Sequence, residues 1–328
     1  MSVRALARLL VLFAALVLIN FLIPRALPGD PLGATLAGSA DGGVPLTPEA
    51  RAELARYYAL DLPLDEQFAR YIGGLARGDL GRSISAQRPV AVIVAGRLPW
   101  SVVLGGLALV LAAAIGGILG VRAASRGRRG ASGLTAAFVA LGALPEFVVG
   151  LVLLVVFAVA LRALPGSGAV TPFAACGGFG GVIGCAADAA AHLVLPLATL
   201  VLAQVPAFYL VMRAAALAQA DEPYVVTARA KGLDDRTVAL RHVARNAVIP
   251  FVALFGARAG SVVGGVVIVE TLFAYPGIGQ LTFEAIRVRD YPVLQAVFLV
   301  TGAAVLLATA ASDTLLPLLD PRLRMRAT

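Results

Sequence analysis

The feature that most constrains this chain is the length of its stretches without a charged residue. Residues 98–121 and 189–212 form two uncharged stretches of 24 residues each, and residues 291–312 form a third of 22. Two further stretches, 130–161 and 246–269, hold one charged residue each. A helix needs about 20 predominantly apolar residues to cross the hydrocarbon core of a membrane. Together with an uncharged run near the N-terminus, these stretches predict six membrane-spanning helices, near 8–25, 98–121, 134–161, 192–212, 247–269 and 293–315.

The composition agrees with this interpretation. Hydrophobic residues make up 59% of the chain and charged residues 14%, and the mean hydropathy is +0.89. Soluble domains carry about 25% charged residues. A net charge of +8 would suit a nucleic-acid-binding protein, but such a protein needs a solvated basic face rather than long uncharged stretches. We therefore predict an all-α integral membrane protein surrounded by the lipid bilayer, with no nucleic-acid partner.

Small residues recur at the spacing that brings membrane helices close together. Gly116 and Gly120 are four residues apart, and so are Gly256, Gly260 and Gly264. Helix pairs in membranes use such small-xxx-small patterns because a small residue lets the two backbones approach. The pattern predicts tight helix packing around the second and fifth spans.

The basic residues predict the orientation. With the N-terminus inside, the internal segments hold 15 Lys and Arg residues, and the two short external loops hold three. Short cytoplasmic loops carry an excess of basic residues, so we expect both termini to be cytoplasmic. A cleaved signal peptide is the alternative for the first span, but Leu27-Pro28-Gly29-Asp30 is not a small-x-small cleavage site.

The predicted spans divide the chain into parts. These are a cytoplasmic N-terminus with the first span (1–27), an external segment (28–97), a five-helix core (98–318) that contains an internal loop at 213–246, and a cytoplasmic tail (319–328). We interpret the external segment as a cap on the outer mouth of the core. The alternative is a gate or a docking surface for an external partner.

The external segment carries its own helix signals. Thr47-Pro48-Glu49 combines an N-cap residue, a proline at the first helical position and an acid in the first turn. Phe68, Tyr71, Ile72 and Leu75 have the spacing of one helix face. Val90–Arg97 is expected to be an interfacial helix that leads into the second span.

Both cysteines of the chain, Cys176 and Cys185, lie in the external loop 163–191. The predicted topology places them in a compartment where a disulfide can persist. Two thiols without a nearby imidazole are too few for a structural zinc site. We favour a disulfide that closes a small loop, and two free thiols are the alternative that geometry could enforce.

The internal loop 213–246 contains more structure than a basic loop needs for setting topology. A short helix is expected to begin near Pro223 and to stop at Gly232, because glycine releases the backbone. Asp234 or Asp235 then caps a second, basic helix that runs to Asn246. Two short helices separated by a glycine suit mechanical contact with a cytoplasmic partner.

At this loop the sequence resembles the permease subunits of bacterial ABC importers of the oligopeptide/dipeptide/nickel type. The residues that carry the resemblance span nearly the whole chain: Leu27-Pro28-Gly29-Asp30-Pro31, Gly78-Asp79-Leu80-Gly81, Tyr224–Gly232, Leu240-Arg241-His242, Arg245-Asn246-Ala247, Ile249-Pro250, Glu270-Thr271-Leu272-Phe273, Pro276-Gly277-Ile278-Gly279, Arg289-Asp290-Tyr291-Pro292-Val293 and Asp320-Pro321-Arg322. The chain departs from the family at one place, where Val226-Thr227-Ala228 stands for the Glu-Ala-Ala triplet of the loop motif.

The resemblance implies the type I ABC importer permease fold and a role in the bacterial cytoplasmic membrane. Such a subunit forms half of a pathway for di- or oligopeptides, or for nickel or another small solute, by alternating access. Its partners are a second permease, two cytoplasmic ATPases that bind ATP and Mg²⁺, and an external substrate-binding protein. Carried onto this chain, the ATPase-coupling residues are Tyr224, Thr227, Ala228, Arg229, Lys231, Gly232, His242 and Asn246.

The residues themselves argue against an enzyme. A P-loop needs Gly-Lys followed by Ser or Thr, but the only lysine, Lys231, stands between Ala230 and Gly232. Gly130-Ala131-Ser132-Gly133 matches a serine-protease string, but no histidine is positioned to activate the serine. We therefore expect no catalytic, cofactor or metal site in this chain. A self-sufficient ion-coupled transporter or channel is the less favoured alternative.

Two charged residues lie inside predicted spans, where ionisable groups are costly and call for a partner. Counted along straight helices, Glu146 would lie about 18 Å from the inner end of the third span and Arg258 about 16 Å from that of the fifth. The matched depths predict an ion pair, or two residues that both line the translocation path.

Overall fold

The computed structural model describes residues 3–26, 61–127, 131–171, 179–260, 262 and 266–319. Within them, all regular structure is helical apart from one isolated β-bridge between Arg82 and Pro89. The α-helices are α1 (Val3–Ala26), α4 (Leu64–Ala76), α5 (Val90–Ser125), α6 (Ser132–Gly142), α7 (Glu146–Leu153), α8 (Phe179–Ala220), α9 (Pro223–Ala230), α10 (Asp235–Thr237), α11 (Ala244–Gly260), α12 (Val267–Leu272), α13 (Ile278–Arg287) and α14 (Tyr291–Leu319). Two π-helices, η1 (Leu154–Ala160) and η2 (Val238–Val243), continue α7 and precede α11.

Four stretches of helix in the described residues are long and apolar enough to cross a membrane. They are Val90–Ser125, Ile183–Ala220, Asp235–Gly260 and Tyr291–Ser312, and α6 with α7–η1 makes a fifth if this bent pair is one span. The apolar part of α1, Ala7–Leu22, is shorter. The chain is therefore a multi-pass helical membrane protein, and the count of six spans stays a prediction.

The third predicted span, 134–161, is not one straight helix. The chain bends by 97° between Ser132–Gly142 and Glu146–Ala160. Pro145 precedes the second helix as its N-cap residue. Proline has no N–H for the helical ladder and disfavours the α conformation in the residue before it. Counting charges located the apolar stretch but missed this break.

Two other boundaries differ from the prediction. Helix α8 begins at Phe179, so the second half of the expected external loop 163–191 is helical. The expected fifth span, 247–269, is also not one helix to its end, because α11 stops at Gly260 before the separate helix α12. Alanine-rich sequence extends a helix readily, which explains the early start of α8.

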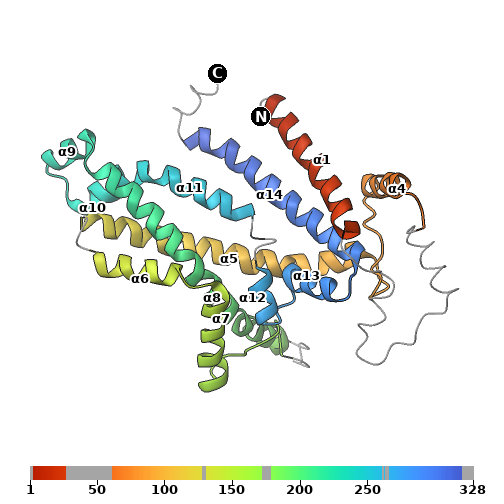
Figure 1. Ribbon diagram of the computed structural model, residues 1–328. Helices are drawn as coiled ribbons and strands as arrows, with labels where there is room; N and C mark the ends of the chain where they lie inside the picture. Colours follow the sequence, from red (N-terminus) through yellow and green to blue (C-terminus); the bar gives the residue numbers. More distant parts are fainter. Residues whose placement is uncertain are drawn as a thin grey trace.

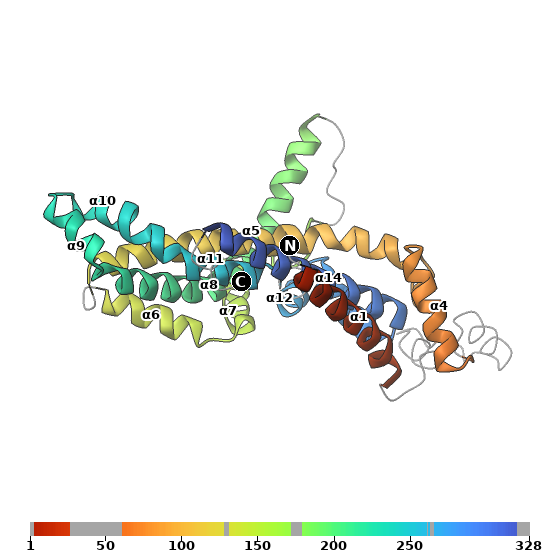
Figure 2. The same cartoon turned by 90° about the horizontal axis from the view of Figure 1, so that it is seen from above.

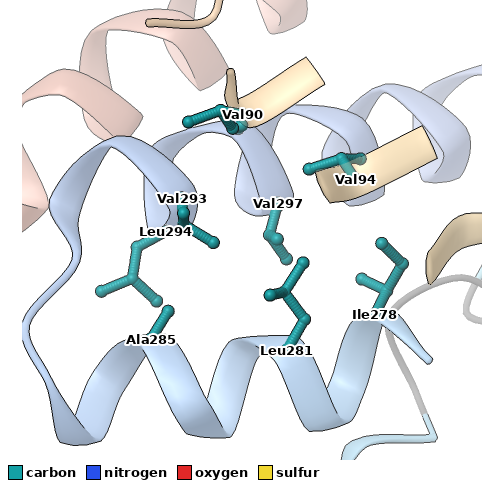
Figure 3. Packing of buried hydrophobic residues seen from close by; sticks show 9 residues of the cluster. Val90, Val94, Ile278, Leu281, Ala285, Val293, Leu294 and Val297 are labelled. Atoms are coloured by element: carbon teal, nitrogen blue, oxygen red, sulfur yellow. The ribbon is translucent and has the colours of Figure 1, made fainter. Parts of the chain in front are cut away.

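Helix α5 runs the length of the bundle and joins its buried clusters (Figure 1). Near its start, Val90 and Val94 pack against Ile278 and Leu281 of α13 and Val297 of α14 (Figure 3). Farther along α5, a second cluster joins it to α8 and α12, and near its end a third joins it to α8, α9 and η2. Because α5 contributes to all three clusters, it links the two ends of the molecule. The residues Val90–Arg97 are its first turns rather than a separate helix.

The small residues of the sequence pattern face neighbouring helices. A Cβ atom on Gly116 would lie 2.6 Å from the Cβ of Phe208 in α8, and one on Gly120 would lie 2.8 Å from the Cβ of Met212. Gly260 faces the backbone of Val305 in α14 in the same way, 3.1 Å away. The expected close packing is therefore present, while Gly264 lies outside the described residues.

Helix α4 lies at the end of the molecule opposite to α9 (Figure 1). Its Phe68 and Tyr71 rings lie 5.0 and 5.8 Å from the ring of Phe21 in α1, so this part of the predicted apolar face packs, whereas Ile72 of the same face is exposed. Asn20 of α1 is buried and donates hydrogen bonds to the Tyr71 hydroxyl (3.1 Å) and to the Gln295 carbonyl (2.7 Å). The expected helix start at Thr47-Pro48-Glu49 lies outside the described residues.

Seen from above, α1 and α14 lie side by side, and the first turns of α8 project from the other helices (Figure 2). Pro196 and Pro206 lie within α8. Each proline leaves one carbonyl of the helix without its usual donor, and prolines are the commonest sites of helix kinks.

Candidate functional site

Helix α9 forms a short, separate element between the long helices α8 and α11, at the left end of the bundle in Figure 1. Pro223 occupies its first turn, where the missing N–H costs nothing. Gly232, just beyond the C-terminus, has φ of +79° and donates its N–H to the Arg229 carbonyl at 2.9 Å. Residues with side chains rarely adopt this left-handed conformation. The sequence predicted both ends of this helix.

One face of α9 is fixed to the bundle. Val225 is fully buried and Ala228 nearly so. They belong to a cluster that we call the α9 anchor, formed by residues of five helices: Val121, Ala124, Met212, Ala216, Val225, Ala228, Val238, Val243 and Ala247. Apolar burial of this kind contributes about 25 cal/mol per Å². Through this cluster α9 shares buried apolar surface with α5, α8 and η2.

The opposite face of α9 is open to solvent. Its exposed side chains include Tyr224, Val226, Thr227 and Arg229, and Lys231 follows them. The Tyr224 hydroxyl donates to Gln219 Oε1 at 2.7 Å, and the Thr227 hydroxyl donates to the Pro223 carbonyl at 2.9 Å. These bonds tie Tyr224 to the last turn of α8 and Thr227 to the first turn of α9.

The second helix of the loop begins as the sequence predicted. The Asp234 carboxylate accepts a hydrogen bond from the Thr237 amide and caps α10. Hydrogen bonds from Thr237 lower the pKa of the Asp234 carboxyl below its usual value. The helix continues as η2, which holds the half-buried His242, and then as α11, whose third residue is the exposed Asn246. π-Helical turns inside α-helices are rare and occur often at functional sites.

At the other end of the bundle, a buried carboxylate joins three helices, which the sequence had shown only as a family motif. Glu270 of α12 is fully buried. Its Oε1 accepts a hydrogen bond from the Ser101 hydroxyl of α5 (2.6 Å), and its Oε2 accepts from the amides of Gly279 (2.7 Å) and Gln280 (3.2 Å) in α13. The Ser101 oxygen in turn accepts from the Ile278 amide (2.7 Å). We call this set the Glu270 network.

The glycines of the Pro276-Gly277-Ile278-Gly279 motif are explained by this network. A Cβ atom on Gly277 would overlap the carboxyl group of Glu270, and one on Gly279 would overlap the backbone of Val267. The N-terminus of α13 thus approaches the carboxylate closely, an arrangement that the helix dipole favours. In the sequence, Glu270 is followed by Gly277 and Gly279. This pattern was the available signal for the Glu270 network.

A second buried carboxylate ties residues 82–89 to the start of α14. Asp290 Oδ2 accepts hydrogen bonds from the Ser83 hydroxyl (2.5 Å), the Ser85 hydroxyl (2.7 Å) and the Ser85 amide (3.0 Å). Its Oδ1 accepts from the Ile84 amide at 3.2 Å. This Asp290 network connects segments about 200 residues apart, which sequence spacing alone does not indicate.

The bend in the third span changes the geometry of Glu146. This residue is the first of α7, directly after Pro145, and it is half-buried. Its depth therefore does not follow from counting along a straight helix. Arg258 of α11 is half-buried as well. As to metal binding, the described residues contain no cluster of three or more His, Cys, Asp and Glu side chains that could hold a metal ion.

The comparison with known families decides the classification. Residues 115–325, about two thirds of the chain, match the family described as the binding-protein-dependent transport system inner membrane component. The chain belongs to this family of ABC importer permeases. The matched region contains α9, Asp290 and every member of the Glu270 network except Ser101.

Several relatives match the permease over almost its entire length. It is 34% identical to the di/tripeptide transport system permease protein DppB of Pseudomonas aeruginosa, over 98% of this chain and 97% of that one. It is 32% identical to the dipeptide transport system permease protein DppB of Escherichia coli K12, over 98% and 97%. It is 34% identical to the glutathione transport system permease protein GsiC of Escherichia coli O6:H1, over 98% of both.

The cysteines of the permease are described only in part. Cys185 lies in the first turns of α8 and is disulfide-bonded. Cys176, the only other cysteine of the chain, lies outside the described residues. The pairing of the two stays a prediction.

The Asp290 network leads to a testable prediction for the permease. Replacing Asp290 with asparagine turns one carboxylate oxygen into an amide nitrogen, which cannot accept, so either the bonds from Ser83 and Ser85 or the bond from the Ile84 amide are lost. We expect residues 82–89 to detach, with amide hydrogen exchange at Ile84 and Ser85 at least tenfold faster than in the wild type. Hydrogen–deuterium exchange with mass spectrometry measures this. Asp65→Asn, at an exposed carboxylate of α4, is the control, and unchanged exchange in Asp290→Asn would contradict the assigned role.

Proposed function

We propose that this chain is the permease subunit of an ATP-driven importer and forms half of a pathway for di- or oligopeptides. Its peptide specificity is supported by the named relatives, which are di/tripeptide, dipeptide and glutathione permeases. The observation that carries the mechanism is the geometry of α9. One face is fixed in the bundle through Val225 and Ala228, and the other is free to contact a partner.

The exposed face of α9 is the proposed contact with a cytoplasmic ATPase. The coupling residues on or directly after it are Tyr224, Thr227, Arg229, Lys231 and Gly232. Ala228 fixes the helix from its buried side, and His242 and Asn246 lie along the continuation through η2 and α11. The basic side chains suit an acidic cleft on the partner.

The route from α9 to the pathway follows from the packing. When the ATPases close on ATP, α9 moves, and the α9 anchor transfers the movement to η2 and to the ends of α5 and α8. Helix α5 extends to the opposite end of the bundle, where the Glu270 network holds α12 and α13. A movement of α9 at the cytoplasmic end thereby alters the opening of the pathway at the opposite end. Alternating access requires such a link between the two ends.

The topology and assembly complete the proposal. Both termini and α9 lie in the cytoplasm, and residues 28–97 lie outside, where a substrate-binding protein delivers the peptide. A second permease supplies the other half of the pathway. Two ATPase subunits bind ATP and Mg²⁺, since the single lysine of this chain is not in a P-loop.

The test is uptake by the complete importer in proteoliposomes. With the binding protein outside and ATP inside, we expect accumulation of labelled Ala-Phe that stops when ATP is replaced by a non-hydrolysable analogue. A nickel salt serves as the competing solute. ATP-independent peptide uptake would support a self-sufficient transporter, and uptake of nickel but not peptide would overturn the substrate assignment.

The proposed role of Glu146 and Arg258 is an ion pair that positions α7 against α11. We expect Glu146→Gln and Arg258→Gln each to lower uptake and thermal stability. In the double variant, the losses of uptake and of thermal stability should be smaller than the sum of the losses in the two single variants. The second change removes a charge that has already lost its partner. Strictly additive losses in both measurements would reject the pairing.

The proposed disulfide joins Cys176 and Cys185 outside the membrane. It would close a short loop directly before the main part of α8. Its support is the bonded state of Cys185 in a chain with two cysteines.

A further inference from the structure

A cavity of about 540 Å³ opens at the end of the bundle opposite to α9. Its walls come from the first turns of α5, from α13, from residues 83–88 and from the start of α14. Pockets that hold small organic ligands have volumes of about 300–1,000 Å³. The cavity therefore has the size of a ligand site, and in the proposed topology it lies on the external side.

The cavity combines basic and acidic side chains with an apolar wall. One of the acids, Asp290, already accepts hydrogen bonds from Ser83 and Ser85. Arg88 and Arg97 line it, and Glu284 lines it from α13. Val92, Ile93 and Trp100 contribute apolar surface along α5. A pocket with a cation, an anion and apolar walls matches a small zwitterion that carries apolar side chains.

The charged groups are available to a ligand. Arg88 is exposed, and within the described residues its guanidinium makes no hydrogen bond or ion pair. Arg97 lies 3.4 Å from the Glu284 carboxylate, and the side chain of Glu284 is 46% exposed. An exposed pair of this kind contributes little to stability, so Glu284 can exchange Arg97 for a ligand ammonium group at little cost.

We propose that this cavity binds short peptides by their charged termini, with Arg88 as the partner of the α-carboxylate and Glu284 as the partner of the α-amino group. Arginine presents a planar fork of N–H donors that matches a carboxylate. Trp100 and the valine and isoleucine side chains of α5 contact the peptide side chains without selecting among them. The cavity is then a receiving site for the peptide between its release from the binding protein and its entry into the pathway.

This inference rests on the proposed function, because it assumes a peptide importer, but it adds a binding site within this chain. The site is preorganised by the two buried networks. Asp290 fixes residues 83–85 next to Arg88, and Glu270 fixes the start of α13, the helix that carries Glu284. Both walls of the cavity are thus held by hydrogen-bonded carboxylates.

The experiment measures peptide binding to the complete importer in nanodiscs without the binding protein, by isothermal titration calorimetry. The probes are Ala-Phe, its C-terminal amide and its N-acetyl derivative. We expect the wild type to bind Ala-Phe at least tenfold more tightly than either blocked peptide. Arg88→Gln should abolish the preference over the amide, and Glu284→Gln the preference over the acetylated peptide. Arg287→Gln, at an exposed arginine of α13 that does not line the cavity, should keep both preferences.

Several results would overturn the proposal. Equal binding of the three peptides by the wild type, no binding at all, or preferences that survive both substitutions would each reject the site. The site would also be rejected if Arg88→Gln and Glu284→Gln weakened only the docking of the binding protein on the same nanodiscs and left peptide binding unchanged. The cavity would then be a contact for that protein. ATP-driven uptake of Ala-Phe separates failure of the binding site from failure of the proposed function. If uptake persists while the site is rejected, the proposed function stands. If uptake is absent, the proposed function fails.

Discussion

Replacing Glu270 with alanine is expected to destabilise the permease more than any other single truncation at this end of the bundle. The change leaves the buried Ser101 hydroxyl, the buried Gly279 amide and the partly buried Gln280 amide without their acceptor. Each unsatisfied buried donor costs about 1–3 kcal/mol, so the total is about 3 kcal/mol or more. This corresponds to a fall in melting temperature of about 5–10 °C, measured by differential scanning fluorimetry of the purified importer.

A conservative variant separates the hydrogen bonds from the volume of the side chain. Glu270→Gln keeps the volume and one carbonyl oxygen, and we expect it to lose less stability than Glu270→Ala. Ser101→Ala should lose an intermediate amount, because it removes a donor to Glu270 and an acceptor for Ile278. If all three variants melt at the wild-type temperature, the network does not hold α12 and α13 in place.

The second large effect is expected from Gly116→Leu in α5. A Cβ atom there would lie 2.6 Å from the Cβ of Phe208, 2.8 Å from the Tyr209 nitrogen and 2.9 Å from the Val205 oxygen. Two of these atoms belong to the backbone of α8 and cannot move away as a flexible side chain can. Overpacking a well-packed site costs about 1–3 kcal/mol, and sometimes more. We expect α5 and α8 to separate, with loss of assembled importer on size-exclusion chromatography.

The same helix supplies the control. Gly106 also lies in α5, but a Cβ atom there would have no neighbour within 4 Å. Gly106→Leu should assemble as the wild type does, since leucine is also the better helix former. Equal assembly of both variants would show that close contact at Gly116 does not determine how these helices pack.

Helix ends and caps could be predicted from the sequence, because they depend on residues that are close together in the chain. Pro223 and Gly232 set the ends of α9, and Asp234 caps the next helix, because each acts on the backbone within a few residues. The apolar face of α4 followed from helical spacing. The contact of Gly116 with α8 agrees with its small-xxx-small spacing.

Other features depend on residues that are far apart in the chain. Glu270 and Ser101 are 169 residues apart, and Asp290 and Ser83 are 207 residues apart, so no periodicity brings them together. The bend at Pro145 was missed because charge-free length does not record where a helix breaks. The cavity between α5 and α13 likewise exists only once the fold has brought Arg88 and Glu284 to the walls of one cavity.

The central claim is that α9 transmits the movement of the ATPases to the pathway, and the most direct test compares uptake with hydrolysis. Thr227→Pro places a ring and removes an N–H in the middle of α9, at an exposed position. Thr227→Ala keeps the helix and loses only the hydroxyl bond to Pro223.

In reconstituted importers that retain both ATPase subunits, Ala-Phe taken up per ATP hydrolysed should fall at least tenfold in Thr227→Pro and stay near the wild-type value in Thr227→Ala. Wild-type coupling in Thr227→Pro would contradict the claim.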